Sequence, residues 1–271
     1  MNPSILLTGG TGTLGRLVLR RLGYSGQQVR VLSRHSHAAG NGVEYVTGDL
    51  STGEGIDAAL GGITTIVHCA GGARGDDDKA RNLVRAASRA DVRHLVYISV
   101  VGAERIPVSG GIDRTLFGYF ASKRAAEVVI AESGLPWTTL RASQFYDLIL
   151  TVARALVKLP VVPTLAGFRF QPVDADEVAA RLVELALGEP AGLVPDMAGP
   201  KVYAMADLVR GYLRATNQHR PLLPIRIPSK AARAFRSGAN LAPEQAVGQR
   251  TWEDFLGRRL RGAAERLQAT R

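Results

Sequence analysis

The sequence is poor in cysteine, in lysine and in long apolar runs. Its single cysteine, Cys69, excludes an intrachain disulfide framework and a zinc site built from several cysteines. No apolar run reaches the ~18 residues that span a bilayer, and the first residues, Met1–Ile5, lack the basic segment and cleavage site of a signal peptide. We therefore expect a cytoplasmic protein that has no membrane partner and binds no metal.

Positive charge is concentrated near the C-terminal end of the chain. Residues 1–200 contain 20 basic and 19 acidic residues, whereas residues 201–271 contain 14 and 5. Such an excess is typical of a surface that binds nucleic acid or an anionic ligand, but a solvated, arginine-rich periphery has the same composition. Only five of the 34 basic residues are lysine, and the arginines are scattered without the interleaved aromatic residues that stack on bases. We favour the solvated periphery and expect no nucleic-acid partner.

Short apolar runs alternate with segments of helical periodicity through the first half of the chain. With 46% hydrophobic and 21% charged residues, the 271 residues suit one large folded domain or one domain with a small appendage. The strand-like runs are nearly continuous in apolar residues, as in parallel strands buried on both faces. They are Ser4–Thr8, Val29–Ser33, Val43–Thr47, Thr65–Cys69, Leu95–Ser99 and Trp137–Arg141. The helical segments between them are Leu14–Leu22, Asp76–Ala90 and Leu116–Ser133. This alternation predicts an α/β fold with a Rossmann-type doubly wound parallel sheet.

The alternation fades after residue 145, where prolines divide the chain into shorter pieces. Helical patterns continue at Asp174–Leu187 and Asp207–Ala215, and the tail from Lys230 to Arg271 looks helical but irregular. We predict a nucleotide-binding core over residues 1–145. Residues 146–271 are expected to form a small C-terminal cap that packs on the core, completes a pocket and is not an independent domain. The sequence leaves monomer and dimer open.

A glycine-rich segment follows the first predicted strand and opens the first predicted helix. It consists of Thr8, Gly9, Gly10, Thr11, Gly12, Thr13, Leu14 and Gly15. Glycines allow a tight turn and bring backbone amides against a pyrophosphate, whose charge the N-terminus of the helix favours. Because the segment lies between a strand and a helix with further βαβ units downstream, we interpret it as a dinucleotide-binding loop rather than a plain turn.

The end of the second predicted strand favours NADP(H) over NAD(H). An NAD site usually has an acidic residue there, about 20 residues after the glycines, that binds the 2′-hydroxyl of the ribose. Here the strand ends in Ser33 and Arg34 and has no acid. Arg34 can pair with a 2′-phosphate, and Arg16, just after the glycines, can join it. The alternative is that both are ordinary surface arginines.

Other small or acidic residues follow the third and fourth predicted strands. Asp49, followed by Leu50, is placed to accept a hydrogen bond from an adenine amino group. Ala70, Gly71 and Gly72 are small enough to let the backbone approach the cofactor. We interpret Cys69 as a packed core residue rather than a nucleophile. The three acids Asp76–Asp78 cannot all face one metal ion, so we interpret them as a solvated helix N-terminus.

A tyrosine and a lysine lie four residues apart within the predicted helix Leu116–Ser133. At this spacing Tyr119 and Lys123 share one helix face, so the ammonium group can stabilise a tyrosinate and lower the pKa of the phenol toward neutrality. Such a tyrosine can donate a proton to a carbonyl group as hydride arrives.

Together these motifs resemble the short-chain dehydrogenase/reductase superfamily, in its atypical NmrA-like, NAD(P)-binding branch that is related to nucleotide-sugar epimerases. The resemblance is carried by Thr8–Gly15, Gly48–Leu50, Leu95–Ser99 with Gly102, Tyr119–Lys123, Gly134–Arg141 and Pro172–Ala179. It implies a Rossmann fold, a bound dinucleotide and a substrate cleft above the carboxyl edge of the sheet.

The resemblance is incomplete at the end of the fifth predicted strand. Reductases of the superfamily have a Ser or Thr there that helps to bind the carbonyl group, and the aligned position in this chain is Val100. The neighbouring Ser99 can replace it only if the strand end turns differently. Tyr119 and Lys123 match the family's pair, and Lys123 is also expected to hold the nicotinamide ribose.

These residues predict an NADPH-dependent oxidoreductase that acts on a small carbonyl, enone, imine or quinone substrate. Gln144, Phe145 and Tyr146, just after the sixth predicted strand, are expected to line the substrate pocket or else to be simple loop packing. The alternative is a non-catalytic dinucleotide sensor that controls a protein partner. A nucleotide-sugar epimerase is less favoured, because no uridylyl site is evident.

Overall fold

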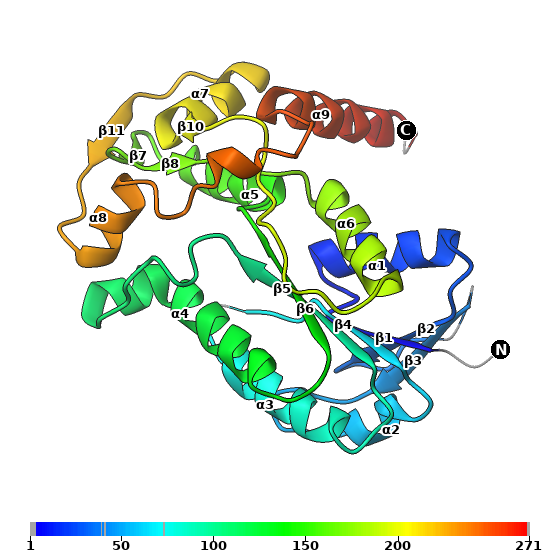
Figure 1. The fold of residues 1–271 in the computed structure, drawn as a ribbon. Coiled ribbons are helices and arrows are strands. Elements are labelled where there is room, and N and C mark those ends of the chain that lie inside the picture. Colours follow the sequence, from blue (N-terminus) through cyan, green and yellow to red (C-terminus); the bar gives the residue numbers. More distant parts are fainter. Residues whose placement is uncertain (1–3, 39, 41, 73, 270–271) are drawn as a thin grey trace.

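A computed structural model describes residues 4–38, 40, 42–72 and 74–269. Its centre is a parallel sheet of the strands β1 (Ile5–Thr8), β2 (Val29–Ser33), β3 (Val43–Thr47), β4 (Thr65–His68), β5 (His94–Val100), β6 (Trp137–Ala142) and β9 (Gly192–Leu193). The strand order is β3-β2-β1-β4-β5-β6-β9, so the order reverses between β1 and β4 (Figure 1). This order is that of a Rossmann sheet, and the expected doubly wound fold is confirmed.

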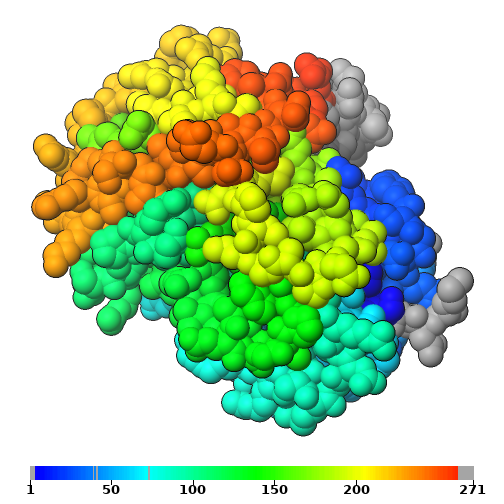
Figure 2. Space-filling view, in the orientation of Figure 1, coloured from blue at the N-terminus to red at the C-terminus, as the bar shows by residue number. Residues whose placement is uncertain are grey.

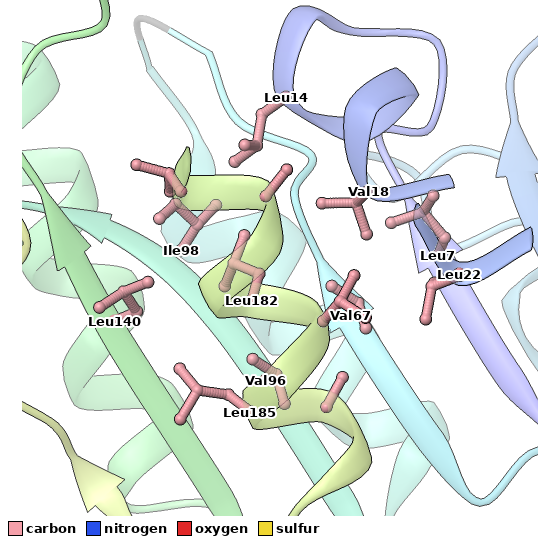
Figure 3. Close-up of a cluster of buried hydrophobic side chains, with 14 of the residues drawn as sticks. Leu7, Leu14, Val18, Leu22, Val67, Val96, Ile98, Leu140, Leu182 and Leu185 are labelled. Atoms are coloured by element: carbon pink, nitrogen blue, oxygen red, sulfur yellow. The ribbon is translucent and has the colours of Figure 1, made fainter. Parts of the chain in front are cut away.

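Helices cover both faces of the sheet because its strands are apolar on both sides. One face carries α1 (Thr13–Tyr24) and α6 (Ala175–Leu187), and the other carries α2 (Ile56–Leu60), α3 (Asp76–Ala87) and α4 (Gly111–Ala131). Figure 3 shows Leu182 and Leu185 of α6 lying over Val67 and Val96 of the sheet. Asp174 caps the N-terminus of α6 by accepting a hydrogen bond from the Asp176 amide.

The small C-terminal cap lies beyond the carboxyl ends of the strands. It contains α5 (Tyr146–Leu156), β7 (Val162–Leu165), β8 (Arg169–Phe170), β10 (Tyr203–Ala204), α7 (Met205–Ala215), β11 (Leu222–Ile225), α8 (Lys230–Arg236) and α9 (Trp252–Ala269). Two short strand pairs, β8 with β10 and β7 with β11, join its helices. In Figure 2 the residues coloured yellow to orange form an upper layer seated on the green and cyan core.

A cluster of aromatic side chains from both the cap and the core packs these two parts together. Phe168 and Phe235 from the cap pack against Phe117 and Phe120 of α4 and against Val100 at the end of β5. The expected boundary between core and cap lies at residue 145, yet α6 and β9 come after it in sequence and pack with the core. The chain therefore enters the cap, returns to the core, and enters the cap again.

None of the described helices combines the length and the apolar character of a membrane span.

Candidate active site

A cavity of about 300 Å³ opens at the carboxyl ends of the parallel strands. Open α/β sheets bind ligands at this edge, where the strand order reverses. The cavity brings together residues that lie far apart in sequence. Its lining includes the expected cofactor residues Gly9, Gly12, Thr13, Leu14, Gly15, Gly71 and Gly72. It also includes the expected catalytic residues Ser99, Tyr119 and Lys123 and the expected pocket residues Gln144 and Phe145.

The glycine-rich loop crosses the cavity with no room for side chains. Gly9 has a φ of +70°, and a Cβ atom on it would lie 2.6 Å from the backbone nitrogen of Ala70. A Cβ atom on Gly15 would overlap the Gly9 carbonyl oxygen. The loop turns through a hydrogen bond of 3.0 Å from the Gly12 amide to this same oxygen and leads directly into α1. This backbone cradle at a helix N-terminus fits the pyrophosphate of a dinucleotide.

Replacing Gly9 by Ala is expected to damage the loop. The added methyl group meets backbone atoms and forces a left-handed conformation on a non-glycine residue, so the free energy of unfolding should fall by about 1–3 kcal/mol. The dissociation constant for NADPH, measured by cofactor fluorescence, should rise at least ~10-fold, since the first glycine of such a motif shapes the tight turn that presents the loop amides to the pyrophosphate.

Gly23→Ala is the matched control within α1. A Cβ atom on Gly23 has no neighbour within 4 Å, so this variant should unfold at the same or higher urea concentration and bind NADPH as the wild type does. Equal cofactor affinity in the Gly9 and Gly23 variants would contradict the assignment of the loop.

Three residues of the expected loop motif have other surroundings. Thr8 is buried, and its Oγ1 lies 2.7 Å from His68 Nδ1 on the neighbouring strand. A Cβ atom on Gly10 would lie 2.8 Å from Val31 Cγ1 of β2, so this glycine serves packing between the loop and the sheet. Thr11 is exposed.

Ser33 ends β2 and Arg34 follows it, and the two residues differ in exposure. Ser33 is buried, and its Oγ accepts a hydrogen bond of 3.2 Å from the His35 amide and lies 3.1 Å from His37 Nε2. Arg34 is exposed and has no ion pair with any described residue. Arg16 is also exposed; it donates to the Gly12 carbonyl at 3.4 Å and lines a separate charged cleft between α1 and α9.

The residues after β3 mainly stabilise their own turn. The Asp49 carboxylate accepts a hydrogen bond of 2.8 Å from the Ser51 amide, which uses one of its oxygens. Leu50 is buried in the core, and its carbonyl accepts a hydrogen bond from Asn82 of α3. Ala70 donates its amide to Thr8 Oγ1 at 3.3 Å and connects the cavity residues Cys69 and Gly71.

The three expected catalytic residues line the cavity with different exposure. Tyr119 is 39% exposed, whereas Lys123 and Ser99 are buried. Ser99 Oγ is buried beside Glu127 of α4, and against the effect of desolvation it helps Arg141 to lower the pKa of that carboxyl. Val100 also lines the cavity.

Lys123 forms an ion pair with the buried carboxylate of Asp76, a residue that we expected to be exposed to solvent. Its Nζ lies 3.2 Å from Asp76 Oδ2 and donates a hydrogen bond of 3.1 Å to the Ile98 carbonyl. Asp76 is 0% exposed, and its Oδ1 accepts hydrogen bonds from the Gly72 amide at 2.9 Å and from Lys79 at 3.1 Å. The interpretation of Asp76–Asp78 as a solvated helix end is therefore wrong for Asp76, which connects α3, α4 and the cavity loop.

This pairing changes the electrostatics expected of the tyrosine. Although burial favours the neutral amine, the neighbouring Tyr97 and Asp76 raise the pKa of Lys123 above its ordinary value. Desolvation, with a smaller contribution from the Asp76 carboxylate, raises the pKa of Tyr119. The expectation that Lys123 lowers the tyrosine pKa toward neutrality is therefore wrong, because the pKa shifts upward and desolvation is the largest cause. Tyr119 therefore carries its proton throughout the neutral range.

A row of buried polar side chains continues from Lys123 across the sheet. Lys123 Nζ lies 4.9 Å from the centre of the Tyr97 ring, and Tyr97 stacks on His68 at 5.3 Å. Burial, assisted by Lys123, lowers the pKa of His68 to about 3, so this histidine is neutral at physiological pH. Sequence analysis missed Asp76 and Tyr97. The signal for Asp76 is its spacing from Ala80, Leu83 and Ala87 along the buried face of α3.

The residues after β6 divide between two environments. Gln144 and Phe145 line the cavity. Tyr146, expected to join them, is 0% exposed and donates its hydroxyl to the Arg250 carbonyl at 2.8 Å, between Trp252 and Phe255. It serves the packing of the cap, because the chain enters α5 at this residue and turns its side chain away from the sheet.

Cys69 lies at the border between the core and the cavity. It packs against the apolar core cluster and lines the cavity directly after β4. Burial raises the pKa of its thiol to about 12, so the thiolate that a nucleophile needs is not formed at neutral pH.

No group of three or more His, Cys, Asp or Glu side chains within the described parts of the chain is arranged to hold a metal ion.

The glycine cradle and the cavity agree with the comparison to known protein families. The family model for NAD(P)H-binding proteins matches residues 9–186, about two thirds of the chain. The chain belongs to this NAD(P)H-binding family. The expected resemblance is thus confirmed at the level of an NAD(P)H-binding family.

Several known proteins are similar to this chain in sequence or in fold. It is 33% identical over 188 residues to (4-alkanoyl-5-oxo-2,5-dihydrofuran-3-yl)methyl phosphate reductase from Streptomyces griseus, a match that covers 68% of this chain and 63% of the reductase. It is 26% identical to the photosystem II assembly factor Ycf39 of Trieres chinensis, covering 91% and 81%. The NADPH-dependent quinone oxidoreductase QOR2 from Escherichia coli, solved with NADPH, has the same fold with a TM-score of 0.79, 18% identity and coverage of 94% and 99%.

Proposed function

We propose that the protein is an NADPH-dependent reductase of a small carbonyl, enone, imine or quinone compound. The observation that carries this proposal is one cavity that joins the glycine cradle of a dinucleotide site to Tyr119, Lys123 and an apolar wall. The reductase name of one relative and the quinone oxidoreductase of similar fold support a reductive activity.

The residues of the cavity divide the work of such a reaction. When bound, the cofactor would supply the hydride. The amides of the loop at the N-terminus of α1 would hold its pyrophosphate. Lys123, fixed by Asp76, would bind the nicotinamide ribose, and Tyr119 would donate the proton of its Oη to the substrate. Ser99, which also lines the cavity, would orient the substrate in place of the hydroxyl that Val100 lacks.

The test is oxidation of NADPH in the presence of one member of each substrate class. We expect the absorbance of NADPH to fall only when protein and an acceptor such as menadione are both present. Tight binding of NADPH without turnover of any of the four classes would contradict the proposal.

A dinucleotide sensor is the second candidate. It is favoured by the ion pair of Lys123 with Asp76, by Val100 at the position of the usual hydroxyl, and by the assembly factor among the similar proteins. Acceptor-dependent oxidation of NADPH distinguishes the two functions. A reductase transfers hydride from NADPH to an acceptor. A sensor binds NADPH and NADP⁺, responds differently to each in its interaction with a protein partner, and oxidises no acceptor. An epimerase is less favoured, because nothing in the cavity points to a sugar nucleotide.

We also propose that the cofactor is NADP(H) rather than NAD(H). Arg34 is exposed directly after β2, has no ion pair with a described residue, and is flanked in sequence by Ser33 and His35 rather than by an acid. A charge-assisted hydrogen bond to the 2′-phosphate contributes about 1.5–3 kcal/mol, or roughly 10- to 100-fold in affinity.

Arg34→Ala is therefore expected to weaken NADPH binding roughly 10- to 100-fold and to leave NADH binding unchanged, as measured by fluorescence titration. Arg89→Ala is the control, since Arg89 is exposed and pairs with Asp57 away from the cavity. A uniform loss of affinity for both cofactors in the Arg34 variant would assign Arg34 to the fold rather than to the phosphate.

A further inference from the structure

A second, apolar cavity adjoins the active-site cavity. It has a volume of about 120 Å³ and is lined by residues of α5, α7 and β8 together with Gln144. The two cavities share two lining residues, Gln144 and Leu148. Leu148 and Val152, one turn apart on α5, are 54% and 40% exposed at the rim. The smaller cavity thus extends the larger one into the cap.

The lining of this cavity contains a single polar side chain. Eight of its nine lining residues are apolar, among them Ala153 of α5, Phe170 of β8 and Val209 of α7. The ninth is Gln144, at the junction with the active-site cavity. Both its Nε2 and its Oε1 are buried, and neither has a hydrogen-bond partner among the described residues. A buried amide without a hydrogen-bond partner is unfavourable, and a ligand in the cavity can supply that partner.

The buried Gln171, in contrast, has the hydrogen bonds expected of a glutamine side chain that stabilises the fold. Gln171 donates Nε2 to the Gly199 carbonyl at 2.9 Å, and its Oε1 accepts a hydrogen bond of 3.0 Å from the Ala242 amide. Gln144 uses only its backbone, whose carbonyl accepts a hydrogen bond from the Val173 amide at 3.0 Å. Its side chain has no comparable role in holding the fold.

We infer that the apolar cavity is a substrate subsite, and that the substrate is a carbonyl compound with an apolar substituent. The substituent enters the cavity between α5 and α7, and Gln144 Nε2 donates a hydrogen bond to the carbonyl oxygen at the junction. This inference rests on the proposed reductase function, and it selects among the proposed substrates those with a short alkyl or aryl group beside the carbonyl.

Binding without turnover tests the subsite. Calorimetric titrations of the protein saturated with NADP⁺ would compare menadione with 2-methyl-3-propyl-1,4-naphthoquinone. Each buried methylene contributes about three- to fourfold in affinity, so the propyl compound should bind more tightly by about tenfold or more. Ala153→Leu, which fills the cavity, should remove this preference. Val152→Phe at the exposed rim is a second blocking variant that leaves the buried packing intact.

The role of Gln144 has its own readout. Gln144→Leu should weaken binding of menadione about tenfold, since a hydrogen bond is lost, but leave binding of 2-methylnaphthalene, which has no carbonyl, unchanged. The melting temperature of Gln144→Leu should stay at or above that of the wild type, whereas Gln171→Leu should lower it. An equal decrease in both variants would make Gln144 structural and overturn its assigned role.

The outcomes separate the subsite from the reductase. If menadione is reduced but the propyl group adds no affinity, or adds the same in the blocked variants, the subsite is overturned and the reductase stands. If the propyl group adds affinity that the blocked variants lose, and no quinone is reduced, the subsite stands and the reductase is overturned.

Discussion

Tyr119→Phe is expected to retain the fold and the affinity for NADPH while turnover falls by a factor of about 10²–10⁴, the usual contribution of a positioned general acid. The phenyl ring preserves the contact with Phe120, whose ring centre lies 5.8 Å from that of Tyr119. Only the hydroxyl at the cavity wall is lost. Single-turnover oxidation of NADPH by the best acceptor of the four classes measures this effect apart from product release.

The raised pKa of Tyr119 also predicts how the rate should respond to pH. Because the phenol keeps its proton through the neutral range, the wild-type rate should show no decline from loss of this proton between about pH 6 and pH 9, a range well below the ordinary tyrosine pKa. Tyr24→Phe is the matched control, since Tyr24 is 83% exposed on the far end of α1. Equal turnover by wild type and Tyr119→Phe would remove Tyr119 from the mechanism.

Lys123→Met is expected to lower both the stability and the cofactor affinity. The substitution leaves the buried Asp76 carboxylate without one of its two lysines, and breaking a buried ion pair costs about 3–5 kcal/mol in the free energy of unfolding. The retained contact of Asp76 with Lys79 places the expected loss at the lower end of this range. Urea denaturation of wild type and variant measures it, and NADPH fluorescence measures the loss of cofactor binding.

The sign of the pH dependence follows from the direction of the Lys123 shift. Its pKa in the folded protein is raised above the ordinary value of 10.5, so its contribution to stability is fully present below that value and is lost as the pH rises through the folded pKa. The stability difference between wild type and Lys123→Met should therefore be constant from about pH 7 to pH 9 and shrink in alkali.

The double variant Asp76→Asn/Lys123→Met isolates the ion pair. It removes both charges together, so it should be more stable than Lys123→Met alone. Asp77→Asn is the matched control in the same turn of α3, because Asp77 is partly exposed and its one ion pair among the described residues is with Arg81 on its own helix. If the double variant were less stable than Lys123→Met, the geometry rather than the charge of Asp76 would hold this part of the fold.

The core of the fold follows from local sequence patterns. Six of the seven strands of the sheet have bounds within one or two residues of the apolar runs that predicted them, because a strand buried on both faces must be apolar throughout. The seventh, β9, contains only Gly192 and Leu193, too few residues to show any period. Helix α5 was missed because its N-cap, Phe145, offers no side-chain cap.

The residues of the site were predictable where backbone geometry requires a particular residue type. They were less predictable where a side chain's role depends on contacts with residues distant in sequence. Gly9 and Gly15 are recognisable because only glycine fits their positions. The partner of Lys123 was not recognisable from the sequence, because Asp76 lies 47 residues away. Its neighbours Asp77 and Asp78 also make the segment look like the solvated N-terminus of a helix. The direction of Tyr146 depends on the packing of Trp252, more than 100 residues later, which no local pattern contains.

The position of α6 and β9 after the first cap elements has a consequence for synthesis on the ribosome. When residues 1–145 have emerged, the strands β1 to β6 are available, but the apolar side of α1 and of the sheet still lacks the helix that Leu182 and Leu185 belong to. This apolar surface stays exposed to solvent while about forty more residues are translated. Nascent chains with such exposed apolar surface aggregate or recruit chaperones. We therefore expect the first half of the chain to be insoluble when produced alone, and fragments to become soluble only once they extend past Leu193.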